Sequence, residues 1–161
     1  MWMNTKKRQD RVLLDNVQYF SEVARLLAEG HSVTIPAKGR SMLPFIIGGR
    51  DSLVLVAAGS LCVGDIVLAR LPERGYVLHR VYRLSGDSLT LMGDGNLRAV
   101  ERCRAGDVVG KAVAILRDGH RRVDCASSAE RRKARLWRHL LPLRRYLLWA
   151  AVRLGFLEAD L

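Results

Sequence analysis

The chain has few cysteines, and their arrangement excludes two common classes of site. Three cysteines occur among 161 residues, at positions 62, 103 and 125, and they show no pairing pattern. Neither they nor the four histidines form a Cys-x-x-Cys or His-Glu-x-x-His motif. A disulfide framework and a structural zinc site are therefore not expected. We expect small reduced thiols, no metal ion and no cofactor.

Long apolar runs are also missing. The longest charge-free run near the C-terminal end, Tyr146–Val152, has seven residues, far fewer than the ~20 that span a bilayer. At the other end, the basic residues 6–8 lead into Asp10, so the apolar core of a signal peptide is lacking. No glycine-rich loop is followed by the helix and lysine of a phosphate site. We therefore expect a cytoplasmic protein without a transmembrane helix.

Positive charge is abundant and unevenly placed. The chain has 27 Lys and Arg against 16 Asp and Glu, a net charge of +11. Residues 117–153 contain eleven basic and three acidic residues, which is +8 of that total. Such a block predicts a solvated face or a partner of negative charge, such as an anionic membrane surface. Nucleic acid is not an expected partner, because the first 30 residues offer one convincing helix, too little for a helix-turn-helix.

Hydrophobic periodicity divides the chain into three parts. Apolar residues of the N-terminal part recur every three or four positions, which predicts an amphipathic helix over residues 8–29 that stops at Gly30. These residues are Leu13, Val17, Phe20, Ala24 and Leu27. We assign residues 1–31 to this helical part, 32–125 to a β domain and 126–161 to a basic helical tail.

The middle part alternates short β-prone runs with turn signals. Strands are predicted at 32–35, 52–57, 65–71, 76–84, 88–92, 107–116 and 120–124. Gly48-Gly49, Ser85-Gly86-Asp87 and Asp118-Gly119 are turn sequences between them. The prediction is a mainly β (α+β) fold, in which a compact antiparallel β domain is flanked by N- and C-terminal helices.

The tail begins with a helix-start signal and contains one interruption. Ser127-x-x-Glu130 is a capping-box pattern, and Pro142 should end or restart the helix that follows. A second helical piece is predicted over Leu143–Leu154. Two interpretations stay open for this tail: its tryptophans and arginines contact the inner surface of a membrane peripherally, or it packs against the β domain with its arginines outward.

A serine, a histidine and two acids lie in one short β-rich span. Ser41 is predicted in a turn after the run 33–35, which Pro36 ends. His79 lies inside an alternating strand. A serine hydroxyl needs a base to take its proton and works better when a third group orients that base. Imidazole, with an ordinary pKa near ~6.5, accepts protons at neutral pH. Asp94 and Glu101 are both candidates for the orienting acid.

The sequence around these residues resembles that of the signal peptidase and LexA-like clan of serine peptidases. The motifs, in order, are Gly39-Arg40-Ser41-Met42, Val63-Gly64-Asp65-Ile66-Val67, Leu78-His79-Arg80-Val81, Gly93-Asp94-Gly95-Asn96 and Asp107-Val108-Val109-Gly110-Lys111. The match covers roughly residues 33 to 116, about half of the chain.

The resemblance also distinguishes two branches of the clan. One branch uses a lysine base, whereas the endoplasmic-reticulum, archaeal and sporulation-type signal peptidases have histidine followed by Arg-Val, as in residues 79–81. The resemblance implies that Ser41 is the nucleophile, that His79 is the general base, and that an acid in or just after the 93–96 motif completes the set. On motif match we favour Asp94 and keep Glu101 as a close second.

The sequence departs from signal peptidases around the serine and at the N-terminus. Gly39 stands where those enzymes usually have a serine that helps the oxyanion hole, so the main-chain N–H of Ser41 is the remaining predicted donor. The membrane anchor usual before the serine is not found. The function expected by resemblance is cleavage of an extended peptide or precursor segment, paired as a strand at 33–37 or 51–56. The alternative is a non-catalytic or self-cleaving basic regulatory module with the same fold.

Overall fold

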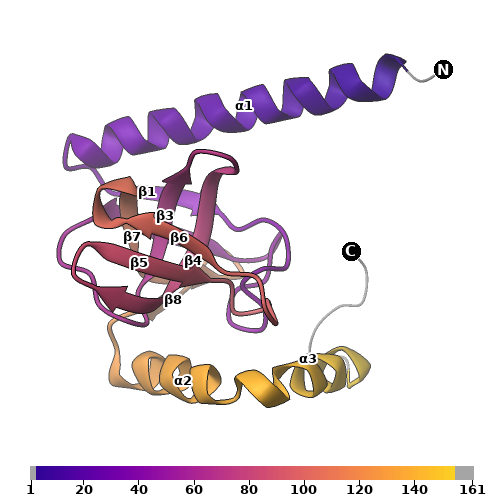
Figure 1. The fold of residues 1–161 in the computed structure, drawn as a ribbon, viewed down its shortest axis with the longest axis vertical. Coiled ribbons are helices and arrows are strands. Elements are labelled where there is room, and N and C mark those ends of the chain that lie inside the picture. Colours follow the sequence, from indigo (N-terminus) through magenta and orange to yellow (C-terminus); the bar gives the residue numbers. More distant parts are fainter. Residues whose placement is uncertain (1–2, 155–161) are drawn as a thin grey trace.

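The computed structural model describes residues 3–154, with side chains from residue 16 onward. An antiparallel sheet forms the centre of the molecule (Figure 1). A long N-terminal helix, α1 (Met3–Ala28), lies along one side of this sheet. Two C-terminal helices, α2 (Ser128–His139) and α3 (Arg144–Arg153), lie along the opposite side. The predicted mainly β fold with flanking helices is confirmed.

Eight strands make up the sheet. They are β1 (Val33–Pro36), β2 (Ser52–Ala57), β3 (Ile66–Leu71), β4 (Gly75–Ser85), β5 (Ser88–Met92), β6 (Glu101–Arg104), β7 (Val108–Arg117) and β8 (Arg121–Asp124). A short 3-10 helix, η1 (Ala105–Asp107), separates β6 from β7. All seven predicted strands are present within one or two residues of their predicted ends. The strand β6 was not predicted.

Strand order decides which backbone edges are open. The order is β1-β2-β7-β3-β4-β5-β6, and β8 pairs with β7. In this sheet of residues 3–154, β1 is an outermost strand, whereas β2 has β1 on one side and β7 on the other. Two segments were predicted to accept a peptide strand. The prediction for 51–56 is wrong, because its strand is already paired on both edges. The segment 33–37 keeps an open edge.

The apolar core lies on both faces of the sheet. Alternate residues of β3 belong to two clusters: Ile66 and Leu68 point into one, and Val67 and Ala69 into the other. This burial on both faces explains why residues 66–69 of β3 are all apolar. The first cluster also contains Val23 and Leu27 of α1. The helix is therefore part of the core at its C-terminal end.

Close contact between α1 and the sheet depends on a glycine. Leu27 is fully buried, and a Cβ placed on Gly110 of β7 would lie 2.6 Å from its Cδ1 atom. Phe20 stacks on Tyr76 at the start of β4, with 5.4 Å between ring centroids. Val17, one turn earlier, is exposed. Leu13, also predicted on the apolar face, lies outside the described side chains.

The C-terminal helices follow the predicted signals. The side chain of Ser127 accepts a hydrogen bond from the main-chain N–H of Glu130 at 3.3 Å, as the capping box predicts. Pro142 lies in a 3-10 turn, η2 (Leu141–Leu143), and α3 starts directly after it. No helix within residues 3–154 is both long enough and apolar enough to cross a membrane.

The packing of α1 predicts that substitutions at two of its positions change the free energy of unfolding by very different amounts. Leu27→Ala should lower the free energy of unfolding by about 3 kcal/mol, because it leaves a cavity where a buried leucine met the sheet. The matched change Val17→Ala on the exposed side of the same helix should cost less than about 0.5 kcal/mol. Urea unfolding followed by circular dichroism measures both. Equal effects of the two substitutions would contradict docking through Leu27.

Candidate active site

Ser41 lies in the loop of residues 37–51 between β1 and β2, and this loop is closed by hydrogen bonds. The main-chain N–H of Ala37 donates to the carbonyl of Asp51 at 2.9 Å, and that of Gly49 donates to the carbonyl of Ala37 at 2.9 Å. The buried carboxylate of Asp51 accepts the N–H of Ile47 at 2.8 Å. The serine is thus held on a loop with fixed ends.

A second loop, residues 93–96, supports the serine directly. The main-chain N–H of Gly95 donates to the carbonyl of Ser41 at 2.8 Å. Two glycines allow this approach, because a Cβ on Gly93 would collide with the Ser41 carbonyl oxygen and a Cβ on Gly95 would lie 2.5 Å from the Arg40 carbonyl oxygen. The Gly-Asp-Gly-Asn motif therefore serves as a support for the main chain of the serine turn.

His79 is paired with Glu101. Its Nδ1 atom lies 2.8 Å from the Oε2 atom of Glu101, and both residues are buried. The other carboxylate oxygen of Glu101 accepts a hydrogen bond from Arg74 at 2.9 Å. A carboxylate accepts hydrogen bonds, so this contact favours the neutral tautomer in which Nδ1 carries the proton and Nε2 has the lone pair. The pair fixes the ring orientation and the tautomer that a general base needs.

Ser41 and His79 line one groove of about 830 Å³. Its walls come from α1, from the end of β1 and the start of the serine loop, and from the first half of β4. Val17 and Phe20 of α1, Ile35 of β1 and Met42 beside the serine make much of the lining apolar. Glu73 and Arg74 at the β3–β4 turn add charge. The groove brings the two predicted catalytic residues to one surface.

Asp94 lies with a different partner, which corrects the preference based on the motif. Its carboxylate accepts hydrogen bonds from the Arg80 guanidinium, with Nε–Oδ1 at 2.9 Å and Nη2–Oδ2 at 2.6 Å. Successive residues of a strand point to opposite faces, so the partner of Arg80 is not placed for His79. Of the two candidate acids, the geometry brings Glu101 to the imidazole.

In the Arg80–Asp94 ion pair Asp94 is buried and the side chain of Arg80 is 15% exposed. Burial acts to lower the pKa of Arg80, but the charge of Asp94 and its hydrogen bonds outweigh burial, so the pKa of Arg80 is raised. A third hydrogen bond joins Arg80 Nη1 to the carbonyl of Gly64 at 2.8 Å. The pair thereby fixes the 93–96 loop to β4.

The C-terminal helices hold the same loop from its other side. The indole Nε1–H of Trp137 donates to the carbonyl of Asp94 at 2.8 Å, and Arg144 Nη1 donates to the carbonyl of Asn96 at 2.9 Å. Trp137 is buried and packs edge-on against Phe45. Of the two interpretations left open for the tail, packing against the β domain therefore holds for Trp137. A continuous chain of contacts runs from α2 and α3 through the 93–96 loop to Ser41.

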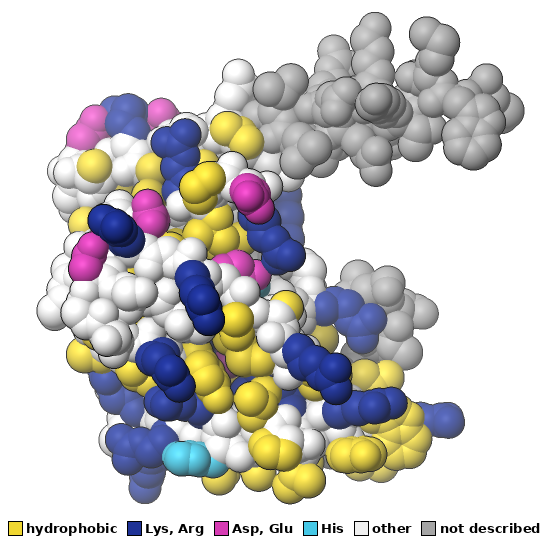
Figure 2. Space-filling model, in the orientation of Figure 1, with side chains coloured by type: hydrophobic (Ala, Val, Ile, Leu, Met, Phe, Trp, Pro, Cys, Tyr) yellow, Lys and Arg dark blue, Asp and Glu magenta, His cyan; other side chains and the backbone are white. Residues whose placement is uncertain are grey.

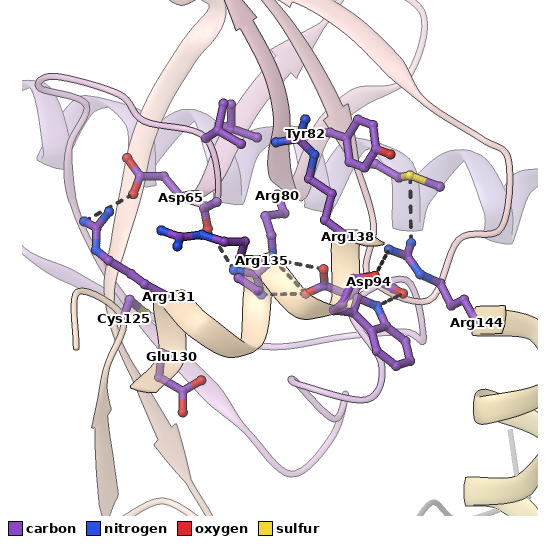
Figure 3. A pocket seen from close by; sticks show the side chains of 16 residues that line it. Asp65, Arg80, Tyr82, Asp94, Cys125, Glu130, Arg131, Arg135, Arg138 and Arg144 are labelled. Atoms are coloured by element: carbon purple, nitrogen blue, oxygen red, sulfur yellow. Dashed lines mark hydrogen bonds and ion pairs between the residues drawn. The ribbon is translucent and has the colours of Figure 1, made fainter. Parts of the chain in front are cut away.

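A second, smaller cavity of about 270 Å³ lies between α2 and the sheet (Figure 3). Five arginines and three acids are among its lining residues, namely Arg80, Arg131, Arg135, Arg138, Arg144, Asp65, Asp94 and Glu130. Arg138 lies over the ring of Tyr82 at 5.0 Å, and an oxygen of Asp65 lies 4.0 Å from Arg131. The residues that line this cavity come from the C-terminal tail and from the sheet. The cavity is separate from the groove of Ser41.

Other nucleophiles and metal ligands are poorly placed. Burial raises the pKa of the Cys125 thiol to about 11, so it stays protonated at neutral pH. Among the side chains that the structure describes, no three His, Cys, Asp or Glu residues form a group that could hold a metal ion. The serine and histidine remain the candidates for chemistry.

Glu101 was a candidate acid from the sequence, but the strand that carries it and two supporting arginines were not predicted. Glu101 begins a strand of four residues in which Arg102 and Arg104 face solvent. The one available sequence signal for this strand is the alternation of its residues between the two faces. Four residues are too few for that alternation to predict a strand. Arg74 and Arg144 carried no sequence signal for their contacts, because only the fold brings them to the site.

The buried ion pair predicts a stability difference between two aspartates. Asp94→Asn should lower the free energy of unfolding by about 3 kcal/mol, because it leaves the partly buried Arg80 charge without its counterion. Asp87→Asn, at an exposed turn position, should change it by less than about 0.5 kcal/mol. Denaturant titration provides the comparison. A harmless Asp94→Asn would contradict a structural role for the pair.

The contact of Trp137 predicts a local effect on the serine turn. Trp137→Phe keeps an aromatic ring but removes the N–H donor, leaving the Asp94 carbonyl unpaired at a cost of about 1–3 kcal/mol. Hydrogen exchange of the peptide that contains Gly95 should then accelerate. Trp149→Phe, which changes an exposed indole, is the control and should leave that exchange unchanged. Unaltered exchange in both variants would disprove the link.

The chain has no match among the protein-family models or the curated proteins with which it was compared. The function of the site must therefore be inferred from its own geometry and from the resemblance of its motifs. Two features of the structure point most directly to a function: the buried pair of His79 with Glu101, and the groove that His79 shares with Ser41.

Proposed function

We propose that this chain is a serine endopeptidase that cleaves an extended peptide or precursor segment, such as a leader or signal-type sequence. The observation that carries the proposal is the buried hydrogen bond between His79 and Glu101, at the groove that Ser41 lines. A histidine held by a carboxylate beside a serine is the arrangement by which a neutral hydroxyl becomes a nucleophile.

Each group has one role in the proposed reaction. The Oγ atom of Ser41 attacks the carbonyl carbon of the scissile bond while Nε2 of His79 takes the hydroxyl proton. His79 then gives this proton to the leaving amine, and an acyl ester remains on Ser41. A water molecule, deprotonated by His79, hydrolyses the ester and restores the free serine. Glu101 holds the imidazole and stabilises its charged form, and the N–H of Ser41 is the predicted oxyanion donor.

The open edge of β1 supports the proposal that the substrate is an extended peptide. Residues 35–37 line the groove, and β1 is an outermost strand of the sheet within residues 3–154. An extended peptide can pair with such an edge, so that its main chain is recognised whatever its sequence. The apolar side chains of the groove, with Val17 and Phe20 of α1 among them, favour apolar substrate residues next to the scissile bond.

Substitution of the three site residues tests the proposal. Wild-type protein incubated near neutral pH with an unbiased peptide library should release fragments detectable by mass spectrometry. Ser41→Ala and His79→Ala should lower kcat by about 1,000-fold or more. Glu101→Gln should lower kcat by about 100-fold or more with a smaller effect on KM, because an amide no longer fixes the tautomer that makes Nε2 the base.

The controls use residues of the same type elsewhere in the chain. Ser60→Ala and His31→Ala change exposed side chains and should leave the cleavage rate within about twofold of wild type. Cleavage that survives Ser41→Ala at an unchanged rate would remove Ser41 from the mechanism. An activity other than cleavage, unaffected by all three site substitutions, would favour the alternative of a binding or regulatory module.

A further inference from the structure

Exposed apolar side chains gather on the C-terminal helices. Of the large hydrophobic residues exposed among the described side chains, six of eleven lie between positions 136 and 154. They are Leu136, Leu143, Tyr146, Leu147, Trp149 and Leu154. Tyr146 and Trp149 have 66% and 63% of their surface exposed. Such large side chains are seldom left in water together unless they have a partner.

Helical spacing places most of these residues on one side of α3. Leu143, Leu147 and Leu154 are separated by four and seven residues, and Tyr146 and Trp149 by three, so they cover adjoining parts of one surface. The opposite side of the helix begins with Arg144, which is buried against the 93–96 loop. We call the exposed side, defined by Leu143, Tyr146, Leu147, Trp149 and Leu154, the α3 face.

Arginines surround the apolar residues of the α3 face. Arg145 and Arg153 are exposed on α3, and the guanidinium of Arg153 lies over the ring of Trp149 at 5.6 Å. Residues 128–154 contain eight Lys and Arg against one acid, Glu130, a net charge of +7. Figure 2 shows Lys and Arg side chains in blue beside yellow hydrophobic ones along the lower edge of the molecule, where α2 and α3 lie.

From these observations we propose that the α3 face binds the surface of an anionic phospholipid membrane. The apolar side chains enter the boundary between headgroups and acyl chains, where tyrosine and tryptophan are favoured. The arginines pair with lipid phosphates and attract the protein to a negatively charged surface. A second copy of the chain fits less well, because it would bring the same positive charge against this face.

The proposed orientation leaves the groove free. Ser41 and His79 lie in a groove with a wall made by α1, and α1 and α3 lie on opposite sides of the sheet (Figure 1). A protein bound through the α3 face therefore presents its groove away from the bilayer. Membrane binding is independent of the proposed peptidase activity, and each can fail without the other.

Vesicle flotation of the full-length protein tests this proposal. The protein should float with vesicles that contain phosphatidylserine and phosphatidylcholine, and its bound fraction should fall when salt is raised, because salt screens the arginines. It should float weakly with phosphatidylcholine alone. The emission of tryptophan should shift to shorter wavelength with the anionic vesicles, and the shift should be absent in Trp149→Phe.

Paired substitutions identify the surface. Tyr146→Ser with Trp149→Ser should weaken binding to the anionic vesicles about tenfold, whereas Leu97→Ser with Val100→Ser, two apolar residues exposed elsewhere, should not. Arg145→Glu with Arg153→Glu should weaken binding similarly. Arg102→Glu with Arg104→Glu, on β6, is the control for charge. Thermal unfolding of each variant shows whether it is folded as the wild type is.

Three results would overturn the proposal. The first is wild-type protein that does not float with anionic vesicles at low salt. The second is flotation that persists equally in the Tyr146 and Trp149 double variant, since another surface would then be responsible. The third is a dimer, seen by analytical ultracentrifugation, that this double variant abolishes while no flotation occurs; the α3 face would then bind a second copy.

Discussion

The alternation of side chains along β4 is the constraint on which the site depends. Neighbouring residues of a strand point to opposite faces, so His79 and Arg80 contact different partners although they are adjacent in sequence. His79 reaches Glu101 at the groove, and Arg80 reaches Asp94 on the other side. A shift of one residue in the pairing of β4 with β3 would exchange the two and separate the histidine from its acid. The register Val67↔His79 therefore fixes the site.

The structure gives the 93–96 loop a different role from the one that the resemblance implies for its motif. Asp94 matches the position where an acid of the catalytic set is expected, yet its carboxylate accepts hydrogen bonds from Arg80 and not from His79. The glycines on either side are needed for another reason: they allow the main chain to approach Ser41 without a collision. The motif is thus explained by support of the serine turn. The acid that contacts His79 is Glu101, the close second candidate, which lies just after the motif.

Sequence patterns predicted the elements well and the contacts between them poorly. The strand β4 and its turn at Gly86 follow from alternation and from a residue that tolerates positive φ, and the tail helix follows from Ser127 and Pro142. These are local properties. The four-residue strand β6 was missed because three of its residues are charged, although Glu101 itself was already a candidate for the acid beside His79. The sequence left the burial of Trp137 undecided, because indole suits a core and an interface equally.

The support of Ser41 from the end of the chain has a consequence for the order in which the site is completed during synthesis. The serine turn, β4 and the 93–96 loop are all made before the helices that carry Trp137 and Arg144. While those helices are still inside the ribosome, the loop beneath the serine lacks its outer contacts. The contacts of the 93–96 loop with Trp137 and Arg144 can form only after residue 144 has emerged and the C-terminal helices have docked. The last segments to be synthesised thus complete the contacts around a loop that was made much earlier.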